Sequence, residues 1–217
     1  MVPLFAYWDI RGMGQPVRLL LEYTDTHYDE KRYRLGPAPD YDQSCWLDVR
    51  LKLGLDFPDL PYFIDGDVKI TQSNAILRYL GRKHDLCGHT EAERMRIDTL
   101  VNQATDARKA FIRRVASQDD TEECRQGSIE TLRSFSDFLG SRTWFAGDNI
   151  TFVDFLMYDV LEQYLQLEDS LLEESKNLQD FQRRFEELPP IKQYMTSPRF
   201  LSTPTNIKMA KFLAKQS

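Results

Sequence analysis

The first eighty residues alternate between short apolar runs and stripes of apolar residues at helical spacing. The run LFAYW at residues 4–8 predicts a strand, and the spacing of Val17, Leu20 and Leu21 predicts a helix with Pro16 in its first position. The other elements predicted here are a strand at 28–35, a helix at 42–53 with Trp46 and Arg50 on one face, a hairpin of strands at 62–64 and 68–70 around Asp65-Gly66-Asp67, and a helix opening at 71–74. The order is β-α-β-α-β-β-α.

Everything after residue 90 has helical periodicity. The predicted helices cover 91–116, 126–139, 151–165, 178–188 (stopped at Pro189-Pro190) and a segment around 191–195. Thr151 and Asp154 have the spacing of a capping box, and the helix they open is apolar nearly all round, which is typical of the middle of a bundle. The polar stretch 81–90, with two glycines, indicates a boundary. We therefore predict an α/β domain at 1–83, a linker at 84–90 and an all-helical domain at 91–217.

Composition narrows the classes of partner. A net charge of −6 argues against a protein that binds nucleic acid or anionic membranes, because both need a basic face. No stretch approaches the roughly 20 apolar residues of a membrane span, and the chain opens without a secretory leader, so we expect a cytoplasmic protein. The three cysteines lack disulfide or zinc spacing and the three histidines lack metal-ligand spacing, so no metal site is expected.

Three places at the predicted strand ends are candidates for ligand binding. Tyr7 stands at the exit of the first strand, where a phenol can point at a bound molecule, or it is a core residue whose hydroxyl reaches a backbone carbonyl. Pro61 precedes the third strand, and the Leu60–Pro61 bond is either an ordinary trans bond or a cis bond that turns the Leu60 backbone toward a ligand. Gln72 and Ser73 open a helix, where they form a carboxylate site or Ser73 is simply the N-cap.

Several segments of the chain together resemble cytosolic glutathione transferases of the mu class. They are YWDIRG (7–12), RLLLEYT (18–24), APDYD (38–42), KLGLDFP (52–58), LPY (60–62), TQSNAILRY (71–79), WFAG (144–147) and TFVDFL (151–156). The resemblance runs through nearly the whole chain and is densest in the first domain. It implies a thioredoxin-like domain with a cis Leu60–Pro61 bond, an all-helical domain, and a homodimer. It also implies conjugation of reduced glutathione, a co-substrate, to hydrophobic electrophiles, with no permanently bound cofactor.

The resemblance also implies roles for individual residues. Tyr7 would donate its hydroxyl proton to the glutathione sulfur, Leu60 would pair its backbone with the cysteinyl part, and Asp106 would reach the ligand bound to the partner subunit. The other implied glutathione contacts are Trp8, Gln43, Trp46 and Arg50 (Trp46 at the glycyl end), Asp59, and Gln72 and Ser73 at the γ-glutamyl carboxylate. The electrophile pocket would draw on Trp8, Met13, Ala116, Ile207 and Met209, and the dimer contact on Phe57 and Arg78.

Four positions depart from the mu pattern. Gln43 stands where a basic residue is usual, Arg50 where a lysine is, Asp59 where an asparagine is, and Ala116 where a tyrosine is. Asp59 adds a negative charge next to an anionic peptide, so we expect weaker glutathione binding than is usual for the class, and the lost hydroxyl at Ala116 is expected to narrow the range of reactions.

Other functions remain alternatives at this level. The same thiolate serves a glutathione-dependent isomerase or peroxidase, and a crystallin-like descendant would keep the fold without turnover. A redox role for Cys45 or Cys87 is less favoured, because neither stands at the strand exit where a thioredoxin-like nucleophile belongs.

Overall fold

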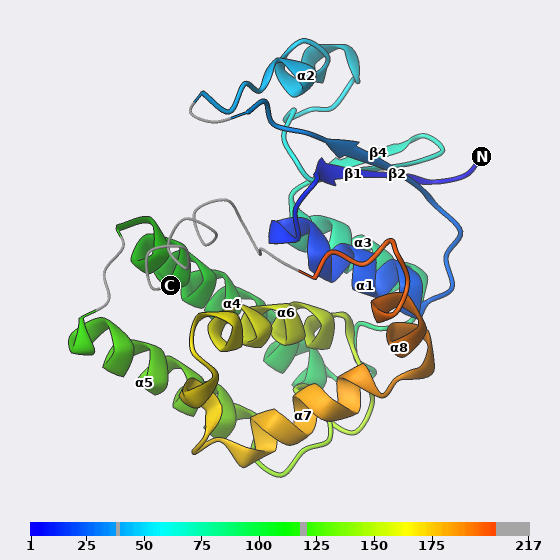
Figure 1. Cartoon of the computed structure of the whole chain (residues 1–217). Helices are drawn as coiled ribbons and strands as arrows, with labels where there is room; N and C mark the ends of the chain where they lie inside the picture. Colours follow the sequence, from blue (N-terminus) through cyan, green and yellow to red (C-terminus); the bar gives the residue numbers. More distant parts are fainter. Residues whose placement is uncertain (38–39, 118–120, 203–217) are drawn as a thin grey trace.

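A four-stranded mixed sheet forms the first part of the molecule. The computed structural model describes residues 1–37, 40–117 and 121–202 (Figure 1). The strands are β1 (Leu4–Trp8), β2 (Asp29–Tyr33), β3 (Tyr62–Asp65) and β4 (Val68–Thr71), in the order β2-β1-β3-β4. Strands β1 and β2 are parallel, and the other pairs are antiparallel. The predicted hairpin is confirmed, with Gly66 at a positive φ in its turn.

Helices α1 (Gln15–Tyr23) and α3 (Ser73–Lys83) lie between this sheet and the helices of the second part (Figure 1). Those helices are α4 (Glu91–Ser117), α5 (Glu122–Leu139), α6 (Phe152–Leu167), α7 (Lys176–Glu186) and α8 (Pro189–Met195), with a short 3₁₀ helix, η3 (Asp169–Leu172), before α7. Residues 84–90 form neither helix nor strand. The predicted fold class, an α/β part followed by an all-helical part, is confirmed.

Helix α6 is buried along most of its length, as its apolar sequence predicts. The predicted capping box is present: the Asp154 carboxylate accepts hydrogen bonds from the backbone N–H and hydroxyl of Thr151 at 2.8 and 3.0 Å. It also accepts one from the Phe145 N–H at 2.8 Å, which ties the preceding loop to the helix. Because it is fully buried, the pKa of Asp154 is raised to about 6.

The register of the sheet brings three separate segments to one edge. Ala6 of β1 lies opposite Tyr62 of β3, and Tyr62 lies opposite Thr71 of β4. Since these neighbouring strands run in opposite directions, the residue after Ala6, the residue before Tyr62 and the residue after Thr71 share that edge. The sheet therefore gathers Tyr7, Pro61 and Gln72, the three places selected from the sequence.

Four local predictions were wrong. The helix predicted at 42–53 is only α2 (Ser44–Leu47) and a 3₁₀ turn, η2 (Arg50–Lys52), because Asp48-Val49 are poor helix formers and Trp46 alone is fully buried in these two turns. Helix α5 begins four residues before the predicted 126. Pro189-Pro190, predicted only to stop a helix, are also the first two residues of α8. Pro16, predicted at the first helical position, is the second residue of α1.

The segment 196–202 returns across the first part of the molecule (Figure 1). Arg199 forms a two-pronged ion pair with Glu22 of α1 at 2.6 and 2.7 Å, and its carbonyl accepts a hydrogen bond from Arg32 of β2 at 2.8 Å. The Ser202 carbonyl accepts one from Arg11 at 3.1 Å. These contacts fasten the last described residues to α1, β2 and the loop after β1.

Candidate functional site

The Tyr7 ring lies between β1 and the short 3₁₀ helix η1 (Gly12–Gly14) that follows it. Its hydroxyl accepts a hydrogen bond from the Met13 backbone N–H at 3.1 Å. A Cβ at Gly12 would lie 2.8 Å from this hydroxyl, and a Cβ at Gly14 would lie 2.6 Å from the ring. The two glycines therefore permit a close approach that no larger residue allows without movement.

Among the described residues, none accepts a hydrogen bond from the Tyr7 hydroxyl. Its proton is therefore available for a hydrogen bond to a ligand. The alternative expectation, that the hydroxyl donates to a backbone carbonyl, is wrong, because the hydroxyl accepts a hydrogen bond from a backbone N–H. Burial raises the pKa of the Tyr7 phenol, while the Met13 N–H and the charges of Arg108 and Arg18 act to lower it. Tyr7 is thus a neutral, oriented donor at the sheet edge.

Aromatic side chains cluster at the same edge on the other face of the sheet, because Trp8 alternates with Tyr7 along β1 and pairs with Tyr33. Trp46 is buried and stacks on Tyr62 at 5.9 Å between ring centroids, and Tyr33 packs edge-on against Trp46 at 5.3 Å. The hydroxyls of Tyr33 and Tyr62 are hydrogen-bonded at 3.1 Å. Trp8 is half-buried at the end of β1 and packs edge-on against Tyr33. The expected face shared by Trp46 and Arg50 does not exist, because the helix ends between them.

The Leu60–Pro61 bond is cis, as the resemblance implies. Asp59 beside it is exposed, and its carboxylate accepts hydrogen bonds from the Leu60 N–H at 2.8 Å and, at the limit of the range, from the Gln72 amide at 3.5 Å. The Leu60 N–H and the Gln72 amide, which belong to the expected glutathione site, thus both donate to the Asp59 carboxylate. The sequence identified Asp59 as a departure but not this pairing.

Gln72 and Ser73 lie at the start of α3. The cap residue of this helix is Gln72, at φ +73°, and Ser73 is its first helical residue, so the alternative of Ser73 as the N-cap is wrong. A positive φ is uncommon for a residue with a Cβ and is concentrated at functional positions. It places the exposed Gln72 side chain beside Asp59 and leaves the buried Ser73 at the positive end of the helix dipole.

The remaining predicted site residues are on the surface. Gln43, Arg50 and Ala116 are exposed, and Asp106 is exposed with Lys109 at 3.5 Å. Phe57 is 77% exposed although it is apolar, Met13 is partly exposed, and Arg78 pairs with Asp98 at 3.0 Å. Ile207 and Met209, and the loop residues 38–39 of the resemblance, lie outside the described residues.

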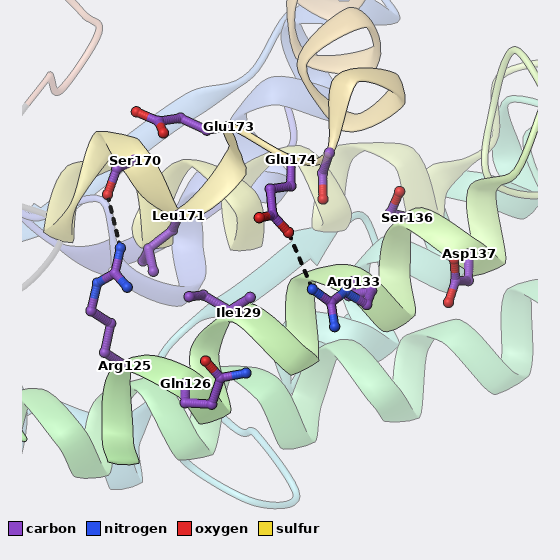
Figure 2. A pocket seen from close by; sticks show the side chains of 11 residues that line it. Arg125, Gln126, Ile129, Arg133, Ser136, Asp137, Ser170, Leu171, Glu173 and Glu174 are labelled. Atoms are coloured by element: carbon purple, nitrogen blue, oxygen red, sulfur yellow. Dashed lines mark hydrogen bonds and ion pairs between the residues drawn. The ribbon is translucent and has the colours of Figure 1, made fainter. Parts of the chain in front are cut away.

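Other features of the described residues do not extend this site. Within 1–37, 40–117 and 121–202, no group of three or more His, Cys, Asp or Glu residues has an arrangement that holds a metal ion, and no helix is long and apolar enough to cross a membrane. A cleft of about 520 Å³ lies between α5 and η3, where Arg125 points at Ser170 and Arg133 at Glu174 (Figure 2). It contains none of the predicted site residues.

Comparison with known proteins identifies the family. The glutathione S-transferase N-terminal domain model matches residues 4–82, and the C-terminal domain model matches residues 105–198. Glutathione S-transferase Mu 7 of Rattus norvegicus is 57% identical over 209 residues, which cover 94% of this chain and 95% of that protein. Glutathione S-transferase Mu 1 of Bos taurus is 53% identical over 211 residues, which cover 95% and 96%.

Solved structures agree with this assignment. The glutathione S-transferase Blo t 8 superposes with a TM-score of 0.83 at 31% identity, covering 94% of this chain and 96% of that one. A pi-class glutathione S-transferase of Onchocerca volvulus gives 0.81 at 27% identity, covering 96% and 99%.

The chain therefore belongs to the glutathione S-transferase family. Within that family it is a mu-class enzyme, a transferase that conjugates glutathione. The predicted family, class, enzyme type and reaction are confirmed, and nothing in the comparisons favours the isomerase, peroxidase or crystallin-like alternatives.

Proposed function

We propose that Tyr7 activates glutathione by donating its hydroxyl proton in a hydrogen bond to the sulfur. The observation that carries this role is the Tyr7 hydroxyl itself, which is held by the Met13 N–H and has no acceptor among the described residues. A thiol of pKa about 8.5 is only a few per cent ionised at neutral pH, and lowering that pKa by about two units takes about 2.7 kcal/mol. One hydrogen bond to a charged group supplies about 1.5–3 kcal/mol.

The reaction then needs no nucleophile from the protein. The thiol proton leaves to solvent and the thiolate sulfur forms a bond to an electrophilic carbon, while the bond from that carbon to its leaving group breaks and the leaving group takes the electron pair. Holding the apolar substrate beside the sulfur adds rate through proximity. The electrophile pocket is proposed from Trp8, Met13 and Ala116, together with Ile207 and Met209.

The other proposed contacts are each assigned to one part of the glutathione molecule. Leu60 pairs with the cysteinyl unit, and Gln72 and Ser73 hold the γ-glutamyl carboxylate, a role supported by the start of α3. Trp46, with Gln43 and Arg50, faces the glycyl end. Trp8 and Asp59 complete the set within one subunit, and Asp106 reaches the ligand of the partner subunit.

Assembly and location complete the proposal. We propose a homodimer in which the exposed Phe57 and Arg78 make contact with the partner subunit, supported by the large exposed area of an apolar ring. We also propose a cytoplasmic enzyme without a permanently bound cofactor, with the domain division at 1–83, 84–90 and 91–217.

Tyr7→Phe tests the proposed catalytic role. We expect glutathione binding to persist and turnover with an aryl halide to fall by about one to two orders of magnitude, as for the loss of one such hydrogen bond. Tyr194→Phe is the matched control, because its buried hydroxyl has no hydrogen-bond partner among the described residues. Unchanged turnover in Tyr7→Phe removes Tyr7 from the mechanism.

A further inference from the structure

One side of the C-terminal half of α4 combines apolar and cationic residues. Ala116, assigned above to the electrophile pocket, lies two turns after Lys109, so the two project from the same side of the helix. Ile112 and Arg113 lie between them on this side, three and four positions after Lys109. We call these four residues the α4 face.

The α4 face lies next to the Tyr7 site. Burial raises the pKa of the Tyr7 phenol, and the charge of Arg108, one turn before Ile112, is close enough to oppose that shift. Arg108 itself is buried and donates to Asp159 of α6 at 2.5 Å, so it is not available to a substrate. Ile112 is partly buried against the core, and the other three members of the face are exposed. A molecule bound beside Tyr7 therefore meets the α4 face and not the buried guanidinium.

The two cations of the α4 face outweigh the carboxylate beside them. Asp106 lies 3.5 Å from Lys109, but the two side chains are 69% and 68% exposed, and water weakens such a pair. In the proposed dimer Asp106 also serves the glutathione bound to the partner subunit, which draws it away from Lys109. Arg113 forms no ion pair with any described residue. The face is thus positive, in a chain whose net charge is −6.

The arrangement of the face suits a molecule with an apolar body and a negative group. Side chains of an α-helix lean toward its N-terminus, so a larger residue at position 116 would cover the turn that carries Ile112 and Arg113. The methyl group of Ala116 leaves that turn open, and an apolar ring can rest on it. Lys109 and Arg113 are neighbours on the helix surface because four positions separate them, so one anionic group placed between them contacts both.

We propose that Lys109 and Arg113 make the enzyme selective for hydrophobic electrophiles that carry an anionic group such as a carboxylate. The apolar body lies on Ile112 and Ala116, and the anionic group pairs with the two cations. The reaction is the one described above: the thiolate sulfur bonds to the electrophilic carbon, and the leaving group departs with the electron pair. The proposal rests on the function assigned to Tyr7 and on the electrophile pocket proposed around Ala116.

Two aryl chlorides of matched shape test this selectivity: a chlorodinitrobenzene with a carboxylate para to the chlorine, and the same compound with a neutral carboxamide there. The measured quantity is kcat/KM for the carboxylate divided by kcat/KM for the amide. A change in glutathione binding or thiol ionisation affects both substrates alike and cancels in this ratio. We expect Lys109→Met to lower the ratio about three- to fivefold, the size of one exposed charge pair. We expect Lys109→Arg to retain the ratio, and Lys109→Met combined with Arg113→Met to lower it further.

Arg133→Met, on α5, is the matched control. It removes a cation of similar exposure, 58%, that pairs with Glu174 in a cleft without predicted site residues, so the ratio is expected to stay unchanged. Added salt is expected to lower the ratio in the parent enzyme and to leave it unchanged in the double variant. An unchanged ratio in the double variant, or an equal fall in Arg133→Met, overturns the proposal. A parent enzyme that converts neither compound with glutathione overturns the proposed function of the Tyr7 site instead.

Discussion

Gly14 is the residue at which a single methyl group tests the geometry of the site. Its backbone has a helical conformation (φ −82°, ψ −24°) that alanine adopts without strain, so Gly14→Ala adds only a steric conflict. The new Cβ would stand 2.6 Å from Cδ1 of Tyr7 and 2.9 Å from its Cγ. To reach ordinary contact at about 3.4 Å, the ring or η1 moves by about 0.8 Å (3.4 − 2.6).

That displacement gives the expected size of the effect. A shift of about 1 Å in a group that positions a reacting atom costs up to about 100-fold in rate, and overpacking a buried site costs about 1–3 kcal/mol of stability. We therefore expect Gly14→Ala to lower kcat by about 10- to 100-fold. Glutathione affinity is expected to change much less, because Leu60, Gln72 and Ser73 are not displaced.

Steady-state kinetics with an aryl halide and calorimetry with glutathione separate the two effects. Gly127→Ala is the control: on α5, nothing lies within 4 Å of its added Cβ, and the substitution is expected to stabilise the helix by about 1 kcal/mol without changing kcat. If Gly14→Ala retains the parent kcat while it folds normally, the Tyr7 ring is not held by this contact and the reasoning fails.

Two further predictions concern carboxylates. Asp59→Asn is expected to bind glutathione about 3- to 10-fold more tightly by titration calorimetry, a gain of about 1 kcal/mol, because the substitution removes a charge that repels the peptide and weakens the hydrogen bond that holds the Leu60 N–H. Asp67→Asn, in the exposed hairpin turn, controls for the change in net charge. Weaker binding by Asp59→Asn would contradict this prediction. Asp154 has its folded-state pKa raised from 3.8 to about 6, so the neutral carboxyl is the form that folding favours: this contribution is complete below about pH 4 and is lost as pH rises through 6. The stability advantage of the parent over Asp154→Asn, measured by urea unfolding, is therefore expected to shrink by about 2 kcal/mol between about pH 4 and 7, and an advantage that grows with pH would refute this sign.

The long helices were predictable because the spacing of their apolar residues indicates which face is buried. The stripe of α4 and the capping box of α6 each depend on residues within a few turns, and both were found. Helix α2 was not, since Trp46 is buried by the sheet residues Tyr33 and Tyr62 and not by a helical stripe of its own. There the tertiary environment, absent from a local pattern, decides the structure.

The candidate site, like the fold, has some features that the sequence predicted and others that it did not. The sequence predicted the strands and turns that carry Tyr7, Pro61 and Gln72, and the register of the sheet, which it did not predict, brings them to one edge. The positive φ of Gln72 and the hold of Asp59 on the Leu60 N–H are local but leave no sequence signal of their own. The pairing of Arg108 with Asp159 joins residues 51 positions apart, so no spacing rule finds it.

The return of segment 196–202 has a consequence for the order in which the molecule is completed. Its contacts with Glu22, Arg32 and Arg11 join residues separated by 177, 167 and 191 positions. During synthesis the sheet and α1 leave the ribosome long before Arg199 exists, although these contacts need both. The earliest part of the enzyme to be made thus acquires this ion pair only after residue 199 has been made, and until then Glu22 keeps only its hydrogen bond from the Tyr28 hydroxyl.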